Sequence, residues 1–372
     1  MTSISCKPLR VLVIDDTHLY RTILSDTLSA IAEVEVVGTA ANGEIALSKL
    51  ADLAPDLITL DVEMPVMDGL ATLRKLRELG SRAVVVMVSA HTKQGAAVTM
   101  EALQLGAYDF ITKPEERDPQ KSRAMLESKL RPMINAIMTK RILRQTINTM
   151  ATTKGGATTQ AKPGDQTSLP VFKREGALST ERVEIVAIGI STGGPTALAD
   201  LLPRFPASFR VPIVIVQHMP KLFTGALAES LDAKSAIRVV EAQHGQPLFP
   251  GCAYIAPGGR QMRVAPLEGQ RGHCVEITDA PPENHCQPSA DYLFRSVASV
   301  FKGRALGVIM TGMGSDGVLG LRLMKRHGVM VIAQDQASCV VYGMPQEAVK
   351  AGVVDTILPL ADIGPEIMKR VR

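Results

Sequence analysis

Short apolar runs alternate with amphipathic segments along most of this chain, and this alternation constrains the fold more than any other feature. In the first third, runs rich in Val, Ile and Leu span residues 9–14, 34–38, 57–60, 83–88 and 110–112. The segments between them carry apolar residues at helical spacing. Such runs are typical of parallel strands that helices cover on both faces. We therefore predict a doubly wound, flavodoxin-like α/β domain with strand order 2-1-3-4-5.

The last half of the chain repeats this alternation with its own strands and helices. Strands are predicted at residues 185–189, 213–216, 239–241, 305–310 and 329–333. Helices should open near Pro195, Phe223, Ser289, Gly317 and Pro345. Between residues 246 and 279, Gly- and Pro-rich turns separate short pieces at 253–256 and 275–278, which we interpret as antiparallel hairpins. The sequence thus predicts a second doubly wound, Rossmann-like domain with a small hairpin insertion.

The segment between these stretches differs in composition. Residues 121–150 carry apolar residues at helical spacing, with Pro132 expected to kink this helix or to begin a second one. From residue 152 to 181, Thr, Gly, Lys, Gln, Pro and Ser dominate, which is typical of a flexible linker. We predict a receiver-like domain over 8–131, a helix and linker over 132–181, and a second domain over 182–372.

Composition excludes several classes of protein. With 372 residues and 46% hydrophobic residues, the chain can bury two cores, and a formal charge of +4 does not indicate nucleic-acid binding. We find no signal peptide and no apolar run long enough to insert into a membrane. Five cysteines without a Cys-x-x-Cys motif fit reduced thiols. We expect a cytoplasmic monomer.

Acidic residues stand where strands of the first domain end. Asp15 and Asp16 follow the first strand and Asp61 ends the third, so a parallel sheet brings all three to one edge. Three carboxylates there predict a divalent cation such as Mg²⁺. Ser89 and Lys113, at the ends of the fourth and fifth strands, could bind phosphoryl oxygens. Solvated acids at strand ends would explain one Asp but poorly explain all five groups.

The motifs Val-Leu-Val-Ile-Asp-Asp, Leu-Asp-Val-Glu-Met-Pro-Val-Met-Asp-Gly, Val-Ser-Ala and Phe-Ile-Thr-Lys-Pro resemble the receiver domain of two-component response regulators. This resemblance implies that Asp61 accepts phosphate from a histidine kinase and that Ser89 and Lys113 sense the phosphoryl group. It also implies a Mg²⁺ site formed by Asp15, Asp16, Asp61 and the Glu63 carbonyl. Phe110 stands where the family often has a switch aromatic.

A candidate nucleophile, Ser191, lies between a predicted strand and a predicted helix. It matches Gly-x-Ser-x-Gly, and the surrounding glycines permit a tight turn that projects the side chain. The helix N-terminus leaves N–H groups, such as that of Thr192, for an oxyanion. A Ser N-cap before Pro195 would also explain the pattern. A P-loop would not, because no Gly-Lys-Ser/Thr follows.

Two further residues complete a possible triad. His218 ends the next predicted strand, and Asp316 follows a later strand in a Gly-rich turn, so both should reach the edge that holds Ser191. His218 could act as general base and Asp316 could orient its imidazole. The order Ser, His, Asp differs from the order in α/β-hydrolases, which disfavours that family.

Two His-Cys pairs could suggest zinc binding. Neither His273-Cys274 nor His285-Cys286 has the ligand spacing of a zinc site, so we interpret them as loop residues and predict no metal for hydrolysis.

The strings Ile-Gly-Ile-Ser-Thr-Gly-Gly-Pro, Val-Gln-His-Met-Pro, Pro-Ser-Ala-Asp-Tyr-Leu-Phe and Met-Thr-Gly-Met-Gly-Ser-Asp-Gly resemble the bacterial chemotaxis protein-glutamate methylesterases. The receiver in front completes that family's architecture. The resemblance implies a triad of Ser191, His218 and Asp316, with Thr192 and Met313 lining the site. It also implies a phosphorylation-activated enzyme that hydrolyses glutamate methyl esters on chemoreceptors and deamidates receptor glutamines. A chemotaxis histidine kinase would be the phosphodonor.

Two other functions share part of this pattern. A response regulator with a non-catalytic output domain would keep the whole first third, but a DNA-binding output would be helical, shorter and basic. A general small-ester hydrolase would keep the triad without needing a receiver.

Overall fold

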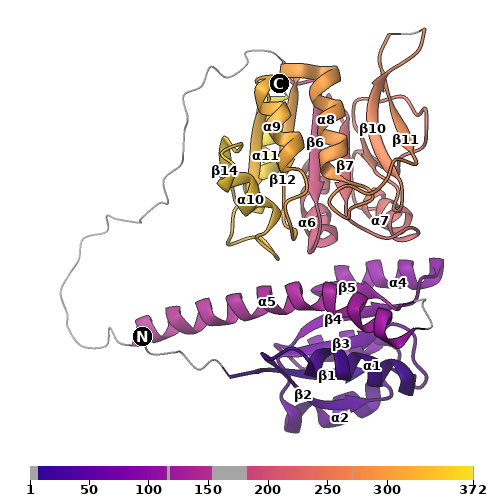
Figure 1. The fold of residues 1–372 in the computed structure, drawn as a ribbon, viewed down its shortest axis with the longest axis vertical. Coiled ribbons are helices and arrows are strands. Elements are labelled where there is room, and N and C mark those ends of the chain that lie inside the picture. Colours follow the sequence, from indigo (N-terminus) through magenta and orange to yellow (C-terminus); the bar gives the residue numbers. More distant parts are fainter. Residues whose placement is uncertain (1–6, 115–117, 153–181, 270, 372) are drawn as a thin grey trace, which may run out of the picture. The chain divides into compact units, whose positions relative to one another are not determined.

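The structure is a computed structural model that describes residues 7–114, 118–152, 182–269 and 271–371. It contains two α/β domains with parallel sheets (Figure 1), as the alternation of strands and helices predicts. The predicted linker lies outside the described residues for all but its first residue, Thr152, which ends a helix.

The first sheet has the order β2-β1-β3-β4-β5, which confirms the flavodoxin-like prediction. Its strands are β1 (Leu9–Ile14), β2 (Val34–Ala40), β3 (Leu57–Asp61), β4 (Val84–Ser89) and β5 (Asp109–Thr112). β1 pairs in parallel with β2 and β3, and β3 pairs in parallel with β4. Because Ile14 pairs with Leu60, the next residues lie side by side: Asp15 directly follows β1, and Asp61 is the last residue of β3.

Five helices connect these strands and follow them. They are α1 (His18–Ser29), α2 (Gly43–Leu53), α3 (Gly69–Glu78), α4 (Lys93–Gln104) and α5 (Pro119–Thr152). α1 packs with α5, and α2 packs with α3. Contrary to one alternative for Pro132, no second helix begins there, because α5 continues through the proline. The proline removes a single i→i−4 hydrogen bond, and buried neighbours such as Leu130 and Ile134 hold the helix on the domain.

The second sheet has seven strands in the order β14-β13-β12-β6-β7-β9-β8, and all its pairs are parallel. The strands are β6 (Ile185–Ile190), β7 (Ile213–Gln217), β8 (Arg238–Glu241), β9 (Cys252–Ile255), β12 (Ala305–Ile309), β13 (Met330–Gln334) and β14 (Thr356–Leu358). The strand order reverses between β6 and β12, where open α/β sheets bind ligands.

The hairpin prediction is half right. β10 (Gln261–Pro266) and β11 (His273–Thr278) form an antiparallel pair. The piece at 253–256, however, belongs to β9, which lies between β7 and β8 in the main sheet. β9 is buried at every position, including Tyr254, which is typical of a central parallel strand and not of a half-exposed hairpin.

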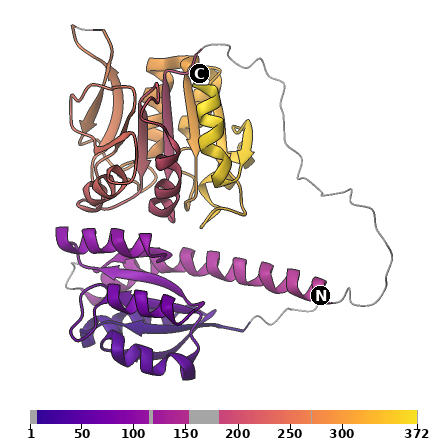
Figure 2. The same ribbon diagram turned by 180° about the vertical axis from the view of Figure 1, so that it is seen from behind.

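Helices cover both faces of the second sheet. They are α6 (Gly194–Leu201), α7 (Phe223–Asp232), α8 (Ala290–Phe301), α9 (Val318–Arg326), α10 (Met344–Lys350) and α11 (Leu360–Arg370). Short 3-10 helices follow α6 and α8, at Leu202–Arg204 and Lys302–Arg304. α8 and α9 lie on one face (Figure 1), and α6 and α11 lie on the other, as the view from behind shows (Figure 2).

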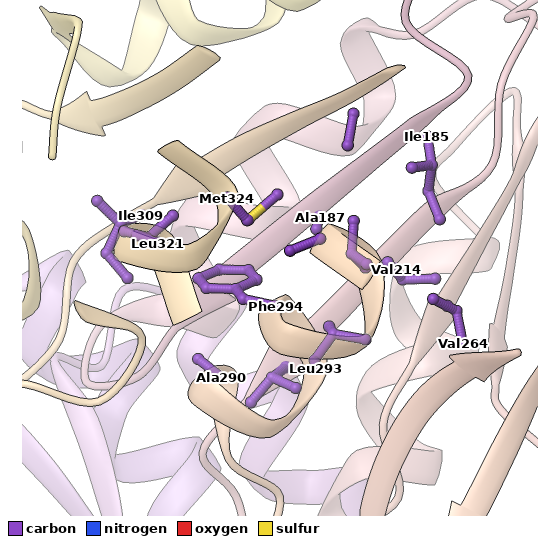
Figure 3. Close-up of a cluster of buried hydrophobic side chains, with 14 of the residues drawn as sticks. Ile185, Ala187, Val214, Val264, Ala290, Leu293, Phe294, Ile309, Leu321 and Met324 are labelled. Carbon is purple, nitrogen blue, oxygen red and sulfur yellow. The ribbon is translucent and has the colours of Figure 1, made fainter. Parts of the chain in front are cut away.

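The core under α8 and α9 explains a glycine near the predicted nucleophile. Phe294 of α8 packs among Ala187, Ile309 and Met324 (Figure 3). A Cβ added to Gly189 would lie 3.0 Å from the Phe294 ring, so the strand needs a glycine for the helix to approach. Truncating a buried Phe in such a place typically costs about 3–5 kcal/mol of stability. The packing of Phe294 thus fixes β6, the strand that ends directly before Ser191.

Across the described residues, no helix has the length and apolar character needed to cross a membrane.

Candidate active site and phosphorylation site

The carboxyl edge of the first sheet brings together the predicted acidic residues. Lys113 Nζ lies 2.7 Å from Asp61 Oδ2 and 2.9 Å from Asp15 Oδ2. Asp15, Asp61 and Ser89 are buried, and Asp16 is exposed. Oxygen atoms of Asp15, Asp16 and Asp61 all lie within 4.8 Å of one another. The edge therefore concentrates three carboxylates, two of which form ion pairs with one lysine.

The charges at this edge are only partly balanced. Burial raises the pKa of the Asp61 carboxyl to about 6, although its hydrogen bond to Lys113 opposes that rise. Burial likewise raises the pKa of Asp15, against the same lysine. A second cation would relieve the remaining repulsion, and an all-oxygen donor set suits a hard ion such as Mg²⁺. The residues present thus fit the predicted magnesium site.

The other predicted receiver residues surround this edge. Glu63 is exposed in the loop after β3, and Phe110 is half-buried in β5. α3 begins directly after this loop at Gly69, where an added Cβ would lie 2.1 Å from the Asp61 carbonyl oxygen. Any side chain at Gly69 would therefore displace the backbone of Asp61.

In the second domain, strand pairing places Ser191 next to His218. Ile190 pairs with Gln217 between β6 and β7, so the following residues stand at neighbouring strand ends. The His218 N–H donates to the Ile190 carbonyl at 3.1 Å, and the Ser191 N–H donates to the Thr311 carbonyl at 2.9 Å. Parallel pairing thus brings three separate strand ends, those of β6, β7 and β12, to one place.

Asp316 forms a hydrogen bond with the imidazole ring of His218. His218 Nε2 lies 2.7 Å from Asp316 Oδ2, and the carboxylate is almost fully buried. The start of α8 also binds this carboxylate: Ser289 Oγ donates at 2.7 Å, and the N–H groups of Ala290 and Asp291 donate at 2.6 and 3.1 Å. A helix N-terminus favours a negative charge. Four donors thus hold one carboxylate in a fixed orientation.

These hydrogen bonds set the charges of the pair. Burial tends to raise the pKa of Asp316, but the hydrogen bond from His218 and the donors of α8 outweigh it and hold that pKa below its ordinary value. Burial disfavours a charged His218, but its contacts with Asp316 and Cys286 outweigh burial and raise the pKa of the imidazole to about 9. The pair therefore favours an imidazolium next to a carboxylate.

Close backbone approaches shape the turns around Ser191. A Cβ on Gly312 would lie 2.7 Å from Ser191 Cβ, and a Cβ on Gly194 would lie 1.9 Å from Gln217 Oε1. Gln217 Nε2 in turn donates to the Ser191 carbonyl at 2.9 Å. Gly194 and Gly312 are therefore needed for the backbone and side chains to pack this closely around the serine.

The two predicted lining residues lie in these turns. The Thr192 carbonyl accepts a hydrogen bond from Thr311 Oγ1 at 2.9 Å, and Met313 is 42% exposed in the turn before Asp316. The described structure brings Ser191, His218 and Asp316 to one edge and Thr192 and Met313 to the adjoining turns.

Sequence reasoning missed three residues at this edge. Ser289 was expected only as a helix start, yet its side chain donates to Asp316. Asp291, whose pKa burial raises to about 6, lies directly behind that carboxylate. Cys286 was expected in a loop, but its Sγ lies 3.8 Å from His218 Nδ1. The Pro-Ser-Ala-Asp string signalled the helix start; no local signal connected it to Asp316.

Comparisons with known proteins identify the family of each domain. A family model described as CheB methylesterase matches residues 186–367, and one described as response regulator receiver domain matches residues 11–125. A relative from Desulfotalea psychrophila named protein-glutamate methylesterase/protein-glutamine glutaminase is 47% identical over 366 residues, covering 98% of this chain and 99% of its own. A relative from Bacillus subtilis with the same name is 42% identical over 368 residues, covering 98% of this chain and 99% of its own.

A solved structure is also similar to the second domain. The catalytic domain of Thermotoga maritima CheB methylesterase is 38% identical, with a TM-score of 0.49, and the match covers 51% of this chain and 99% of that one.

Proposed function

Since this chain belongs to the protein-glutamate methylesterase/protein-glutamine glutaminase family, we propose that Ser191, His218 and Asp316 are its catalytic triad. The substrates would be glutamate γ-methyl esters and glutamine side chains of chemoreceptors. The observation that carries the proposal is the meeting of Ser191 and His218 at neighbouring strand ends, with Asp316 at 2.7 Å from the imidazole. Nucleophile, base and orienting group are the three parts of such a triad.

The hydrogen bond between His218 and Asp316 supports a separate role for each ring nitrogen of His218. Nε2 is bonded to Asp316, so Nδ1 is the nitrogen that can exchange a proton with Ser191. In the proposed reaction, Nδ1 takes the Ser191 proton while Oγ attacks the side-chain carbonyl carbon. His218 then returns that proton to methoxide or to the departing amine, and methanol or ammonia leaves.

Water completes the cycle. It attacks the resulting acyl-serine, and His218 accepts its proton. His218 then passes this proton to Ser191 Oγ as the ester bond breaks, which releases glutamate and restores Ser191. The N–H of Thr192, at the turn into α6, is the proposed donor to the oxyanion of both tetrahedral intermediates, and Met313 would line the substrate site. Esters and amides can share one site because both reactions are acyl transfer at the same carbonyl.

The first domain would switch this chemistry on. We propose that Asp61 accepts a phosphoryl group from a chemotaxis histidine kinase, with Ser89 and Lys113 binding its oxygens. Asp15, Asp16, Asp61 and the Glu63 carbonyl would hold Mg²⁺, which when bound neutralises the incoming phosphoryl charge. The concentration of carboxylates around Lys113 supports this assignment.

Methanol release tests the function as a whole. We expect the full chain to release methanol from membranes that carry methylated chemoreceptors, and to release it faster when Mg²⁺ and a small-molecule phosphodonor are added. Receptors whose methylated glutamates are replaced by alanine serve as the control substrate. Equal methanol from both receptor preparations would contradict the proposed substrate.

The pH dependence tests the base. His218 must be neutral to take a proton, and its pKa is about 9, so kcat/KM should rise about 10-fold per pH unit from pH 6 to 8, reach half its maximum near pH 9 and level off above about pH 10. Asp316→Asn removes the charge that stabilises the imidazolium, so the midpoint should fall toward about 6.5 and the plateau should drop. The rate of methanol release measured with Ser191→Ala at each pH is subtracted, because hydroxide hydrolyses methyl esters without the enzyme. A flat profile between pH 7 and 9 would argue against this base.

A further inference from the structure

A thiol contacts the imidazole nitrogen on which the proposed hydrolysis depends. Cys286 Sγ lies 3.8 Å from His218 Nδ1, while Nε2 of the same ring is bonded to Asp316. The two residues are 68 positions apart, and Cys286 comes from the loop before α8. Hydrolysis as proposed gives this thiol no role. The three side chains nevertheless place a sulfur, a nitrogen and a carboxylate within 4.8 Å of one another.

We propose that His218 Nδ1 and Cys286 Sγ form a binding site for a thiophilic divalent cation such as Zn²⁺, and that this cation reversibly inhibits the enzyme. A tetrahedral Zn²⁺ has bonds of about 2.3 Å to sulfur and about 2.0–2.1 Å to nitrogen, which separates the two ligand atoms by roughly 3.6 Å. The observed separation is 3.8 Å. The two ligands can therefore bind one ion with very little movement.

The surroundings resemble those of metal-binding histidines. Such a histidine usually donates its other ring N–H to a carboxylate, which fixes the ring and strengthens the ligand. Asp316 provides this partner. Because it also accepts from Ser289 and from two N–H groups of α8, its oxygens are already occupied, and we place it behind the histidine rather than on the ion.

The loop also holds the cysteine in place. The Cys286 N–H donates to the Glu283 carbonyl at 2.7 Å, and the Cys286 carbonyl accepts from the Glu283 N–H at 3.1 Å. Gln261 Nε2 donates to the same Cys286 carbonyl at 3.3 Å. A backbone fixed from two sides reduces the ordering that metal binding requires.

Metal binding and hydrolysis would exclude each other. The sulfur–metal bond forms as the thiol proton leaves to solvent. The imidazolium proton on Nδ1 leaves to solvent as well, and the metal takes the lone pair that would accept the Ser191 proton. Two protein ligands leave the remaining coordination positions to water, so the ion should be removable by a chelator. The hard-ion site of the first domain offers oxygen ligands only and prefers Mg²⁺.

Cadmium binding tests the site without relying on activity. With excess Mg²⁺ present, Cd²⁺ added to the full chain should produce the ultraviolet band of a sulfur-to-cadmium charge transfer. Cys286→Ser should lose this band, whereas Cys274→Ser, which changes a buried cysteine of the same domain, should keep it. Asp316→Asn should weaken Cd²⁺ binding by about 10- to 100-fold while keeping the band. A band of full strength in Cys286→Ser would overturn the site.

Zinc inhibition tests the consequence. We expect Zn²⁺ to lower the initial rate of methanol release by the full chain and by Cys274→Ser, and a chelator to restore it. Cys286→Ser, compared with its own metal-free rate, should need at least about 10-fold more Zn²⁺ for the same loss. Equal sensitivity of the two variants would contradict inhibition through Cys286. If the proposed substrate were wrong, the cadmium band would still decide whether the site exists.

Discussion

Ser191→Ala should reduce methanol release on the order of 10⁴- to 10⁶-fold in kcat while leaving the fold unchanged. The expected loss corresponds to about 5 to 8 kcal/mol of transition-state stabilisation. The fold should survive because the contacts that position residue 191 use its backbone. Its N–H donates to Thr311, and its carbonyl accepts from Gly194 and Gln217. Methanol release from methylated receptor membranes measures the activity, and circular dichroism checks the fold.

A matched control separates the loss of the nucleophile from the loss of any hydroxyl. Ser299→Ala makes the same chemical change on α8, where the hydroxyl only donates to the Arg295 carbonyl one turn earlier. It should keep normal activity. The double variant of Ser191→Ala with His218→Ala should lose little more than Ser191→Ala alone, because the triad acts as one unit. A near-normal rate from Ser191→Ala would remove the serine from the mechanism.

Much of the fold follows from local patterns in the sequence. Apolar runs bounded by turn residues predict both sheets, and the strand order of a doubly wound domain then brings strand ends to one edge. This reasoning places Ser191 and His218 together before any contact is known, because each directly follows the carboxyl end of its strand, and the observed pairing of Ile190 with Gln217 agrees with it. Motif residues at strand ends are thus predictable because topology, rather than side-chain packing, determines their positions.

Contacts made by irregular loops are not predictable in this way. Cys286 reaches His218 only because the loop before α8 folds back onto the edge of the sheet, and its spacing to His285 says nothing about that. Ser289 has an ordinary N-cap pattern, yet it also binds Asp316. The position of β9 inside the sheet was missed for a similar reason, since a four-residue apolar run fits a hairpin or a buried strand equally well.

Asp61→Ala should abolish incorporation of phosphate from a labelled phosphodonor, and with it the stimulation of methanol release. The carboxylate is the proposed acceptor. It is buried at the end of β3, and Lys113 Nζ lies 2.7 Å from its Oδ2 atom. The domain should remain folded, because Lys113 keeps Asp15 as a partner and because removing a buried acid with a raised pKa relieves repulsion at neutral pH. Asp52→Ala, an exposed acid on α2, is the control and should accept phosphate normally.

Magnesium removal should separate the two chemistries of the chain. A chelator should prevent phosphate incorporation, because Asp15, Asp16 and Asp61 then repel the phosphodonor with no bound cation to offset their charge. The rate of methanol release measured without a phosphodonor should not change, since the proposed acyl transfer uses the triad and a backbone N–H group and needs no metal ion. Asp61→Ala should behave in the same way, with an unstimulated rate that neither phosphodonor nor chelator alters. Labelled phosphate on Asp61→Ala would place the acceptor elsewhere, and a loss of its unstimulated rate would show that the carboxylate contributes to hydrolysis itself.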